Sequence, residues 1–291
     1  MSLSNNFIKM KKYVFKNQNL VEEKKATISI RERGFLFGDG IFETCKIING
    51  KIFDFDLHEA RIHRALKLLK FSAEISDLEK KSYQLIKKNS AENGILRISI
   101  SRGIGSVGYL PTHESAALVI IETFLDRKLP KKIRLEISKI TTPGIAFKPM
   151  SAMAYVLAKI AAEEQKSFDV VMFSDKNFVA ETSSANIFWV KDGKVYTPHE
   201  SCGIVLGCVR ERLLKMPEFK IKKAKAKISA LKNADEIFLT NSAYLVISVD
   251  EFLGRKLKKN VGRKISVALK TQQPIDFIAI QKSPPRRLFK N

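Results

Sequence analysis

The sequence has few cysteines, no long apolar run and no cluster of metal ligands, and each absence excludes a class of protein. Three cysteines in 291 residues cannot form a disulfide framework, and they lack the short spacing of a zinc site. No apolar stretch approaches the roughly 20 residues that a membrane-spanning helix needs, which excludes a membrane protein. The first twelve residues contain no apolar signal-peptide core, so we expect a cytoplasmic protein without a metal.

Acidic residues are too few to balance the basic ones, and the formal net charge is +22. Such a charge attracts nucleic acid, because lysine and arginine neutralise phosphates. Lysine supplies most of the basic residues, however, and is spread along the chain. The densest run, residues 220–227, alternates like the solvated face of a strand and has no aromatic residues for base stacking. A non-enzymatic nucleic-acid-binding protein is therefore only a remote alternative, and we expect neither nucleic acid nor membrane as a partner.

The apolar share of 45% is that of a folded protein, and the length suits two domains that share a site. Short strands and two helices, one starting near Asp56 where D-x-x-E spacing predicts a cap and one after Ser76, indicate a small α/β domain over residues 1–124. A charged, proline-containing stretch over 125–132 is typical of a linker. The strands and helices that follow predict a larger domain over 133–291.

Two residues carry groups suited to cofactor chemistry. Lys148 lies between an apolar segment and a helix that we expect to begin at Pro149. A partly desolvated lysine near the positive end of a helix has a lowered pKa, and its neutral amine is what Schiff-base chemistry requires. Glu181 lies in a strand and turn rich in small residues, where its carboxylate could hold a pyridinium nitrogen protonated. A solvated lysine and a turn glutamate in water are the alternatives.

Three further positions offer groups for a phosphate. Gly207 opens a helix, and the free N–H groups at such a start favour an anion. The segment Thr240–Ser242 ends a strand with hydroxyl and amide donors, and the guanidinium of Arg61 can bind phosphate with two hydrogen bonds. Each signal is weak alone. Together they indicate one phosphate beside one amine and one carboxylate, which are the requirements of pyridoxal phosphate.

With these motifs the chain resembles the class IV aminotransferase family, the fold-type IV pyridoxal phosphate enzymes. The family includes branched-chain and D-amino-acid transaminases and 4-amino-4-deoxychorismate lyases. A single match could arise by chance, but here several occur in the order and spacing of the family. The matching stretches are Arg33–Thr44, His58–Ile62, Ser101–Tyr109, Lys148 with the segment after it, Val179–Phe188, Gly203–Arg210 and Leu239–Ser242.

The resemblance implies an α/β (α+β) fold with a small α/β N-terminal domain and a larger pseudo-barrel C-terminal domain. It implies that Lys148 forms the Schiff base with pyridoxal 5'-phosphate, that Glu181 is the partner of the pyridine nitrogen, and that Arg61 is a phosphate ligand. It also implies a homodimer whose small-domain loops complete the partner's site. The phosphate cup would be completed by the backbone amides of Cys208 and Val209 and by Asn241 or Ser242.

The substrate side departs from parts of the family. Val107 stands where D-amino-acid transaminases and many of the lyases have an arginine for the substrate carboxylate. Arg97 matches the arginine that branched-chain members use instead, although strand alternation leaves open whether it faces the site or solvent. Arg102 and Tyr109 are the fallback ligands of the substrate carboxylate. Phe37 takes the position of a substrate-side tyrosine in branched-chain members.

We therefore predict a class IV aminotransferase, branched-chain-like, that transfers an amino group from an amino acid to a 2-oxo acid. The alternative is 4-amino-4-deoxychorismate lyase, which converts aminodeoxychorismate into 4-aminobenzoate and pyruvate, because the frame of residues 101–109 looks more like the lyases. The amino donor, its stereochemistry and the reactivity of the cysteines stay open. So does the partner of the cofactor's O3′ atom, because Ser151 stands near a common asparagine.

Overall fold

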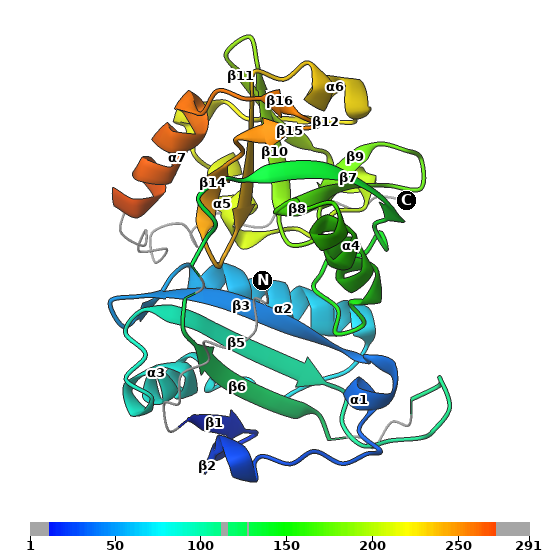
Figure 1. Ribbon diagram of the computed structural model, residues 1–291. Coiled ribbons are helices and arrows are strands. Elements are labelled where there is room, and N and C mark those ends of the chain that lie inside the picture. The colour runs from blue at the N-terminus through cyan, green and yellow to red at the C-terminus, as the bar shows by residue number, and fades with distance from the viewer. Residues whose placement is uncertain (1–11, 112–115, 127, 272–291) are drawn as a thin grey trace, which may run out of the picture.

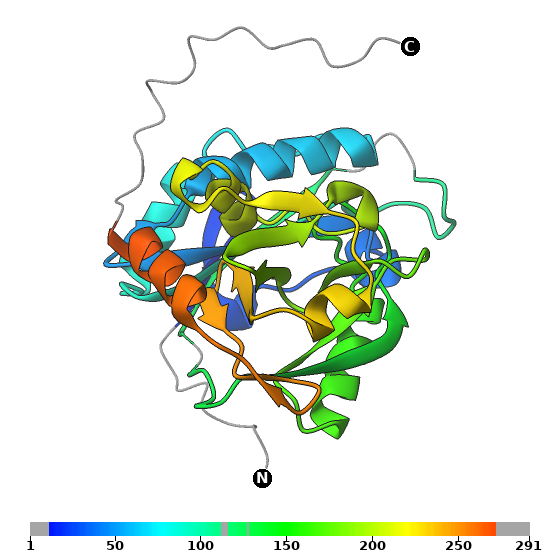
Figure 2. The same cartoon turned by 90° about the horizontal axis from the view of Figure 1, so that it is seen from above.

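The computed structural model describes residues 12–111, 116–126 and 128–271, and it contains two β-sheets with helices packed around them (Figure 1). The N-terminal sheet and the C-terminal sheet lie one above the other, with helix α2 (Phe55–Leu69) near the boundary between them. Seen from above, α2 and helix α4 (Met153–Glu164) lie on opposite sides of the molecule (Figure 2). This mixed α/β architecture with two sheets confirms the predicted fold class.

The N-terminal sheet is antiparallel, with the strand order β2-β1-β6-β5-β3-β4. Its long strands alternate between apolar and polar residues, so that one face packs against the apolar sides of α2 and α3 and forms the core. The elements of this part are β1 (Tyr13–Lys16), β2 (Asn19–Glu22), η1 (Glu23–Lys25), α1 (Arg33–Phe37), β3 (Gly40–Ile48), β4 (Lys51–Ile52), α2, α3 (Leu78–Lys88), β5 (Gly94–Ser101) and β6 (Leu118–Phe124).

The C-terminal sheet is mixed and branches at β10, which pairs with β9, β11 and β13. Strands β8, β9 and β10 are buried on both faces for nearly all their length, as expected for the interior of a layered domain. The strands are β7 (Arg134–Thr141), β8 (Asp169–Phe173), β9 (Val179–Thr182), β10 (Asn186–Lys191), β11 (Lys194–Pro198), β12 (Lys222–Ala224), β13 (Glu236–Asn241), β14 (Leu245–Ser248), β15 (Glu251–Phe252) and β16 (Arg255–Lys256). The helices are α4, η2 (Glu200–Cys202), α5 (Cys208–Leu214), η3 (Pro217–Phe219), α6 (Ile228–Lys232) and α7 (Asn260–Thr271).

The division into domains at residues 125–132 stays a prediction, although the two sheets lie on either side of this segment. The ends of the predicted domains, residues 1–11 and 272–291, lie outside the described residues. Within the described part of the chain, no helix combines the length and the apolar character needed to cross a membrane.

One predicted helix cap and one predicted helix start are wrong. Helix α2 begins at Phe55, near Asp56 as predicted, but its N-cap residue is Asp54, which is left-handed and makes no side-chain cap, so Asp56 already lies in the first turn. Helix α4 begins at Met153 and not at Pro149. The residue before a proline is disfavoured in the helical region. Lys148 accordingly lies outside the helix, and Pro149 forms an isolated bridge with Ile41.

The extended segment of Lys148 joins the two halves of the molecule. It runs along the free edge of β3, where Phe42 N donates to Lys148 O at 3.0 Å and Met150 N donates to Gly40 O at 3.0 Å. This short antiparallel bridge fixes the backbone of Lys148 against the N-terminal sheet. The lysine that the sequence singles out therefore lies at the junction of the two sheets.

Candidate active site

A cavity of about 380 Å³ lies at this junction, and both halves of the chain line it. Strands β3 and β5 and helix α2 contribute from the N-terminal part. The segment before α4, strand β9, the start of α5 and the turn after β13 contribute from the C-terminal part. The cavity brings together predicted site residues that are far apart in the sequence: Arg61, Arg97, Lys148, Glu181, Cys208, Val209, Asn241 and Ser242.

Lys148 has the properties of a reactive amine. Its Nζ lies 4.6 Å from the centre of the Phe42 ring. Burial first, and then the positive charge of Arg61, lower the pKa of Lys148 to about 8, although Glu43 and Glu181 oppose the fall. Of the two predicted causes, desolvation is confirmed, and the helix dipole is wrong because α4 starts five residues later. A large share of neutral amine near pH 8 follows from desolvation and from a neighbouring cation.

Glu181 lies on β9, where it is buried and lines the cavity. Its Oε1 accepts a hydrogen bond from the hydroxyl of Tyr155 at 2.9 Å, and its Oε2 accepts from Val205 N at 3.0 Å and from Asn186 Nδ2 at 3.3 Å. Burial raises the pKa of Glu181 to about 7, although these hydrogen bonds and Lys148 oppose the rise. Such a carboxylate is poised to pair with a cationic ring nitrogen.

Arg61 is held by a carboxylate that sequence analysis did not single out. Its Nε donates to Glu43 Oε1 at 2.7 Å and its Nη2 to Glu43 Oε2 at 2.6 Å, while Nη1 donates to Leu206 O at 2.8 Å. His58, three residues earlier on the same face of α2, places its Nδ1 2.7 Å from Glu43 Oε2. The guanidinium is thereby locked at the cavity wall, and two of its five N–H groups are left for a ligand.

Polar groups at this end of the cavity converge from α5 and β13. Cys208 and Val209 are the first residues of α5, so their N–H groups have no partner inside the helix. A Cβ at Gly207 would lie 2.0 Å from Asn186 Oδ1, so a side chain there would displace Asn186, which donates to Glu181 and to Val205 O. The hydroxyl of Thr240, a cavity residue, is buried and has no hydrogen-bond partner among the described residues.

Asn241 and Ser242 have different tasks at the end of β13. The side chain of Asn241 shapes the turn, because Nδ2 donates to Ser184 O at 3.0 Å and Oδ1 accepts from the N–H groups of Ala243 and Tyr244. The hydroxyl of Ser242 lies 3.4 Å from Nε2 of His58. Of the two predicted alternatives, Ser242 is the one with a side chain left for a ligand.

This set of donors fits a phosphate-bearing cofactor. A phosphate needs several hydrogen-bond donors and positive charge, which free helix N–H groups and an arginine fork provide. Glu43, His58 and Cys208 also place donor atoms within 4.8 Å of one another, an arrangement that can attract a metal ion. Both oxygens of Glu43 are bonded by Arg61, however, whose charge would repel a cation at that place.

Arg97 points into the cavity from β5, which answers the question that strand alternation left open. Its guanidinium stacks on the ring of Phe42, 4.1 Å from the ring centre, on the strand next to it. Phe42 thus lies in contact range of both Arg97 and Lys148. An anionic group of a substrate that reached Lys148 would have Arg97 within the same cavity.

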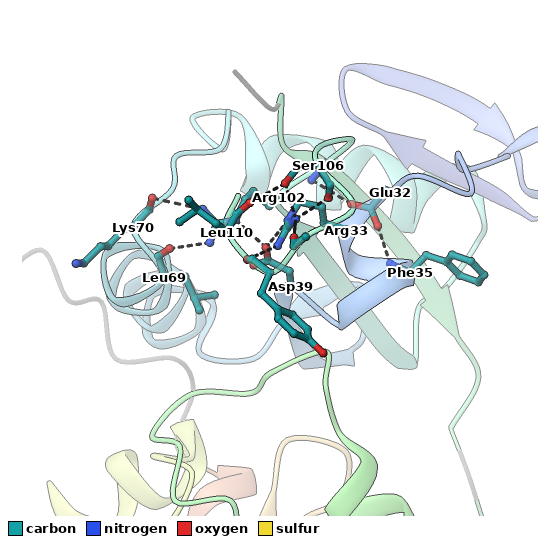
Figure 3. A network of polar contacts seen from close by, with 12 residues as sticks. Glu32, Arg33, Phe35, Asp39, Leu69, Lys70, Arg102, Ser106 and Leu110 are labelled. Atoms are coloured by element: carbon teal, nitrogen blue, oxygen red, sulfur yellow. Dashed lines mark hydrogen bonds and ion pairs between the residues drawn. The ribbon is translucent and has the colours of Figure 1, made fainter. Parts of the chain in front are cut away.

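Phe37, Arg102 and Tyr109 are not among the residues that line this cavity in the described part of the chain. Arg102 donates from Nε to Asp39 Oδ2 at 2.8 Å and from Nη2 to Leu69 O at 2.8 Å (Figure 3). Tyr109 is 89% exposed and packs beside Phe37, with their ring centres 5.6 Å apart. These three predicted substrate ligands therefore lie outside the cavity of this chain. For Arg102 the reason is its bond to Asp39, which the sequence did not reveal.

Three residues that complete the site were not singled out from the sequence: Glu43 and His58, which support Arg61, and Tyr155, which bonds Glu181. Thr240, which the sequence did indicate as a donor, offers a hydroxyl that is free within the described part of the chain. One signal for Glu43 was available: it is a charged residue on the face of β3 that otherwise carries apolar side chains. A buried charge needs a partner, and an arginine on the adjacent helix was the nearest choice.

A family model described as amino-transferase class IV matches residues 40–252. The chain therefore belongs to the class IV aminotransferases, as its motifs predicted, and the members of this family are pyridoxal-phosphate-dependent enzymes. The family includes both transaminases and aminodeoxychorismate lyases. Membership consequently establishes the kind of enzyme and leaves the substrate to be proposed.

Similar proteins carry different activities. D-alanine aminotransferase of Bacillus licheniformis is 27% identical over 251 residues, which cover 83% of this chain and 88% of that protein. Aminodeoxychorismate lyase of Bacillus subtilis is 29% identical over 247 residues, covering 80% and 84%. The crystal structure of the Escherichia coli branched-chain amino acid aminotransferase has a TM-score of 0.83 at 21% identity, covering 89% of this chain and 94% of that one. This likeness confirms the predicted fold type IV.

Proposed function

We propose that the protein is a branched-chain-like amino-acid aminotransferase that uses pyridoxal 5'-phosphate and passes the amino group to a 2-oxo acid. The observation that carries this proposal is the position of Arg97. It lies in the cavity that contains Lys148, whereas Val107 is 70% exposed and Arg102 is bound to Asp39. Among the arginines weighed as carboxylate ligands, Arg97 is the one placed beside the reactive amine.

The residues would hold the cofactor by its two ends. Arg61, Ser242 and the N–H groups at the start of α5 would bind the phosphate, and Glu181 would pair with the ring nitrogen. When bound, the cofactor supplies an electron sink for a carbanion at the substrate's Cα. Ionised Glu181 supports that role, because a negative charge beside the ring nitrogen favours its protonated form.

Lys148 would move the proton. Its Nζ would take a proton from the substrate's Cα and return it at the neighbouring cofactor carbon, as a general acid and base does. A pKa of about 8 suits this task, because the amine is then easily both protonated and deprotonated near neutral pH. Arg97 would hold the substrate carboxylate, since a carboxylate in a desolvated cavity needs a charged partner.

A lyase is the second candidate, and the matching frame of residues 101–109 favours it. The same proton removal by Lys148 would then be followed by release of pyruvate and 4-aminobenzoate. The deciding assay supplies the purified protein with aminodeoxychorismate, and separately with a panel of L- and D-amino acids and 2-oxoglutarate. Glutamate formed together with a keto acid supports the transaminase. Release of 4-aminobenzoate supports the lyase and contradicts the main proposal.

We also propose a homodimer, which the exposed apolar side of α4 supports. Met153, Val156, Leu157 and Ile160 follow one another at helical spacing and are 46–67% exposed. Such a stripe is typical of a protein–protein interface. Sedimentation of the purified protein should give twice the monomer mass, and Leu157→Glu should give the monomer. A wild-type monomer at micromolar concentration would contradict this proposal.

A further inference from the structure

His58 connects the two ends of the proposed phosphate cup. It is buried on α2, with Nδ1 2.7 Å from Glu43 Oε2 and 3.5 Å from the sulfur of Cys208. On the other side of the ring, Nε2 lies 3.4 Å from Ser242 Oγ. A chain of polar contacts therefore runs from β3 through the imidazole to the turn after β13. It ends at a hydroxyl in the cavity wall.

The proton at Nδ1 is determined by Glu43. Burial raises the pKa of this carboxyl, but Arg61 and His58 lower it more, so Glu43 is ionised throughout the neutral range. An ionised carboxylate only accepts hydrogen bonds, so Nδ1 must carry a proton and donate it. Glu43 thus fixes a proton on Nδ1, as carboxylates do in other buried histidine–carboxylate pairs.

The state of Nε2 decides what Ser242 can offer to an anion. If Nε2 has no proton, it accepts the only hydroxyl proton of Ser242, and the oxygen turns its lone pairs to the cavity. If Nε2 is protonated, it donates to Ser242 Oγ, and the hydroxyl proton is free for a ligand. A phosphate would be repelled by the first arrangement and bound by the second.

We propose that Glu43 and His58 position the Ser242 hydroxyl, with His58 as an imidazolium that donates to Ser242 so that Ser242 donates to the phosphate of the cofactor. The inference rests on the proposed function, because it assumes that a phosphate binds beside Arg61. The charged and titratable groups that face His58 are Glu43 and Cys45 on β3, Arg61 on α2, Cys208 on α5 and Asp54 before α2.

Charge balance supports the imidazolium when the phosphate is present. Glu43 and Arg61 neutralise each other, so a phosphate would otherwise meet no net positive charge from this cluster. A protonated His58 supplies that charge through Ser242. The affinity for a phosphate-bearing ligand should accordingly be full below the pKa of His58 and fall as the pH rises through it.

The test compares pyridoxamine 5'-phosphate with pyridoxamine as ligands of the cofactor-free protein, by calorimetry between about pH 6 and 9. His58→Gln places an amide donor near the position of Nε2 and cannot titrate. His58→Asn reaches only towards Glu43. His63→Asn is the matched control, because His63 is exposed on the same helix. Ser242→Ala removes the hydroxyl itself.

We expect the wild type and His63→Asn to lose roughly tenfold or more in affinity for the phosphate-bearing ligand as the pH rises. In His58→Gln the ratio of the two affinities should not change with pH, because Lys148 and Glu181, with pKa values of about 8 and about 7, titrate with both ligands. In His58→Asn and Ser242→Ala the phosphate-bearing ligand should bind weakly at every pH. A wild-type pH profile in His58→Gln overturns the inference while leaving the phosphate cup intact. Equal affinity of the wild type for both ligands overturns the cup, and with it the proposed cofactor site.

If the His58 variants fail to fold, a measurement on the wild-type protein still tests the inference. The ¹⁵N shifts of the His58 imidazole, measured with pyridoxamine 5'-phosphate bound at neutral pH, should show both nitrogens protonated. The His63→Asn protein assists the assignment. A neutral ring in the bound state overturns the inference, because Nε2 would then accept the proton of Ser242.

Discussion

Two buried arginines, Arg33 and Arg61, each pair with a carboxylate but differ in function. Arg33 donates from Nε to Asp39, from Nη1 to the carbonyls of Ser106 and Gly108, and from Nη2 to the carbonyl of Tyr109 (Figure 3). Apart from the bond to Asp39, these donors bind carbonyls in the loop of residues 104–110. Arg61 spends its bonds on Glu43 and one carbonyl, and its remaining N–H groups line a cavity.

The difference teaches how to tell a structural arginine from a binding one. A buried guanidinium must have its donors satisfied, so the donors that protein atoms leave over indicate where a ligand belongs. Around Arg33 the loop carbonyls fill that need, and Arg102 joins through the shared carboxylate Asp39. We call this cluster the loop network. In the cavity, by contrast, Arg61 retains N–H groups that no atom of the described residues accepts, and these can bind a ligand.

The largest expected effect distinguishes a lysine in the cavity from a lysine on the protein surface. Lys148→Ala should lower turnover by at least about 10³, because the general acid and base is lost. Lys139→Ala, an exposed lysine on the strand that leads towards the same segment, should leave turnover unchanged. Steady-state kinetics with the preferred substrate measures both. Comparable turnover in the two variants would contradict the assignment of Lys148.

The two arginines themselves give the next largest effect. Arg61→Lys should lower the affinity for pyridoxal 5'-phosphate by about 10², because lysine keeps the charge but loses the fork. Arg33→Lys should leave that affinity unchanged and lower the free energy of unfolding by about 2–4 kcal/mol, because loop carbonyls lose their donors. Cofactor titration and thermal unfolding of both variants decide. Equal loss of affinity would break the comparison.

A third test compares the arginines proposed for the substrate carboxylate. Arg97→Met should lower kcat/KM for an amino acid by roughly 10–100-fold and change the rate with its carboxylate-free amine analogue little. Arg102→Met, in the loop network, should affect both substrates alike. An equal effect of Arg97→Met on both substrates would leave Arg97 with a structural role only.

The smallest expected effect concerns two carboxylates of opposite behaviour. Burial raises the pKa of Glu181 to about 7, so the folded protein holds a proton that the unfolded chain releases near pH 4.5, and stability falls as the pH rises between these values. Glu181→Gln should remove this fall and stabilise the cofactor-free protein at pH 8 by about 1–3 kcal/mol. Urea unfolding at several pH values measures it. An unchanged slope would contradict the shift.

Asp39 provides the matched control for that measurement. Burial raises its pKa, but Arg102 and Arg33 lower it more, to below its ordinary value of 3.8. Its contribution to stability is therefore present above that ordinary value and is lost as the pH falls through the lower folded pKa. Asp39→Asn should destabilise the protein at neutral pH, opposite in sign to Glu181→Gln. The same sign in both variants would contradict the comparison.

The sequence by itself determined the fold class and the family, and it singled out most of the residues proposed for the chemistry. The motifs around Arg61, Lys148 and Glu181 combine residue types that one cofactor requires, and local chemistry is written in such short stretches. The short strands of the N-terminal part were also predicted, because strand signals depend on neighbouring residues alone. The start of α4 was missed, since the extended segment at Pro149 is held by a distant strand edge.

Only the tertiary structure decided which charged residues face the cavity. Arg97 and Arg102 lie five positions apart, yet one lines the cavity and the other binds Asp39. The pairing of Glu43 with Arg61 and His58 likewise depends on β3 packing against α2. A side chain's partner is set by the packing of elements distant in sequence, and its pKa and role follow from that partner and from burial.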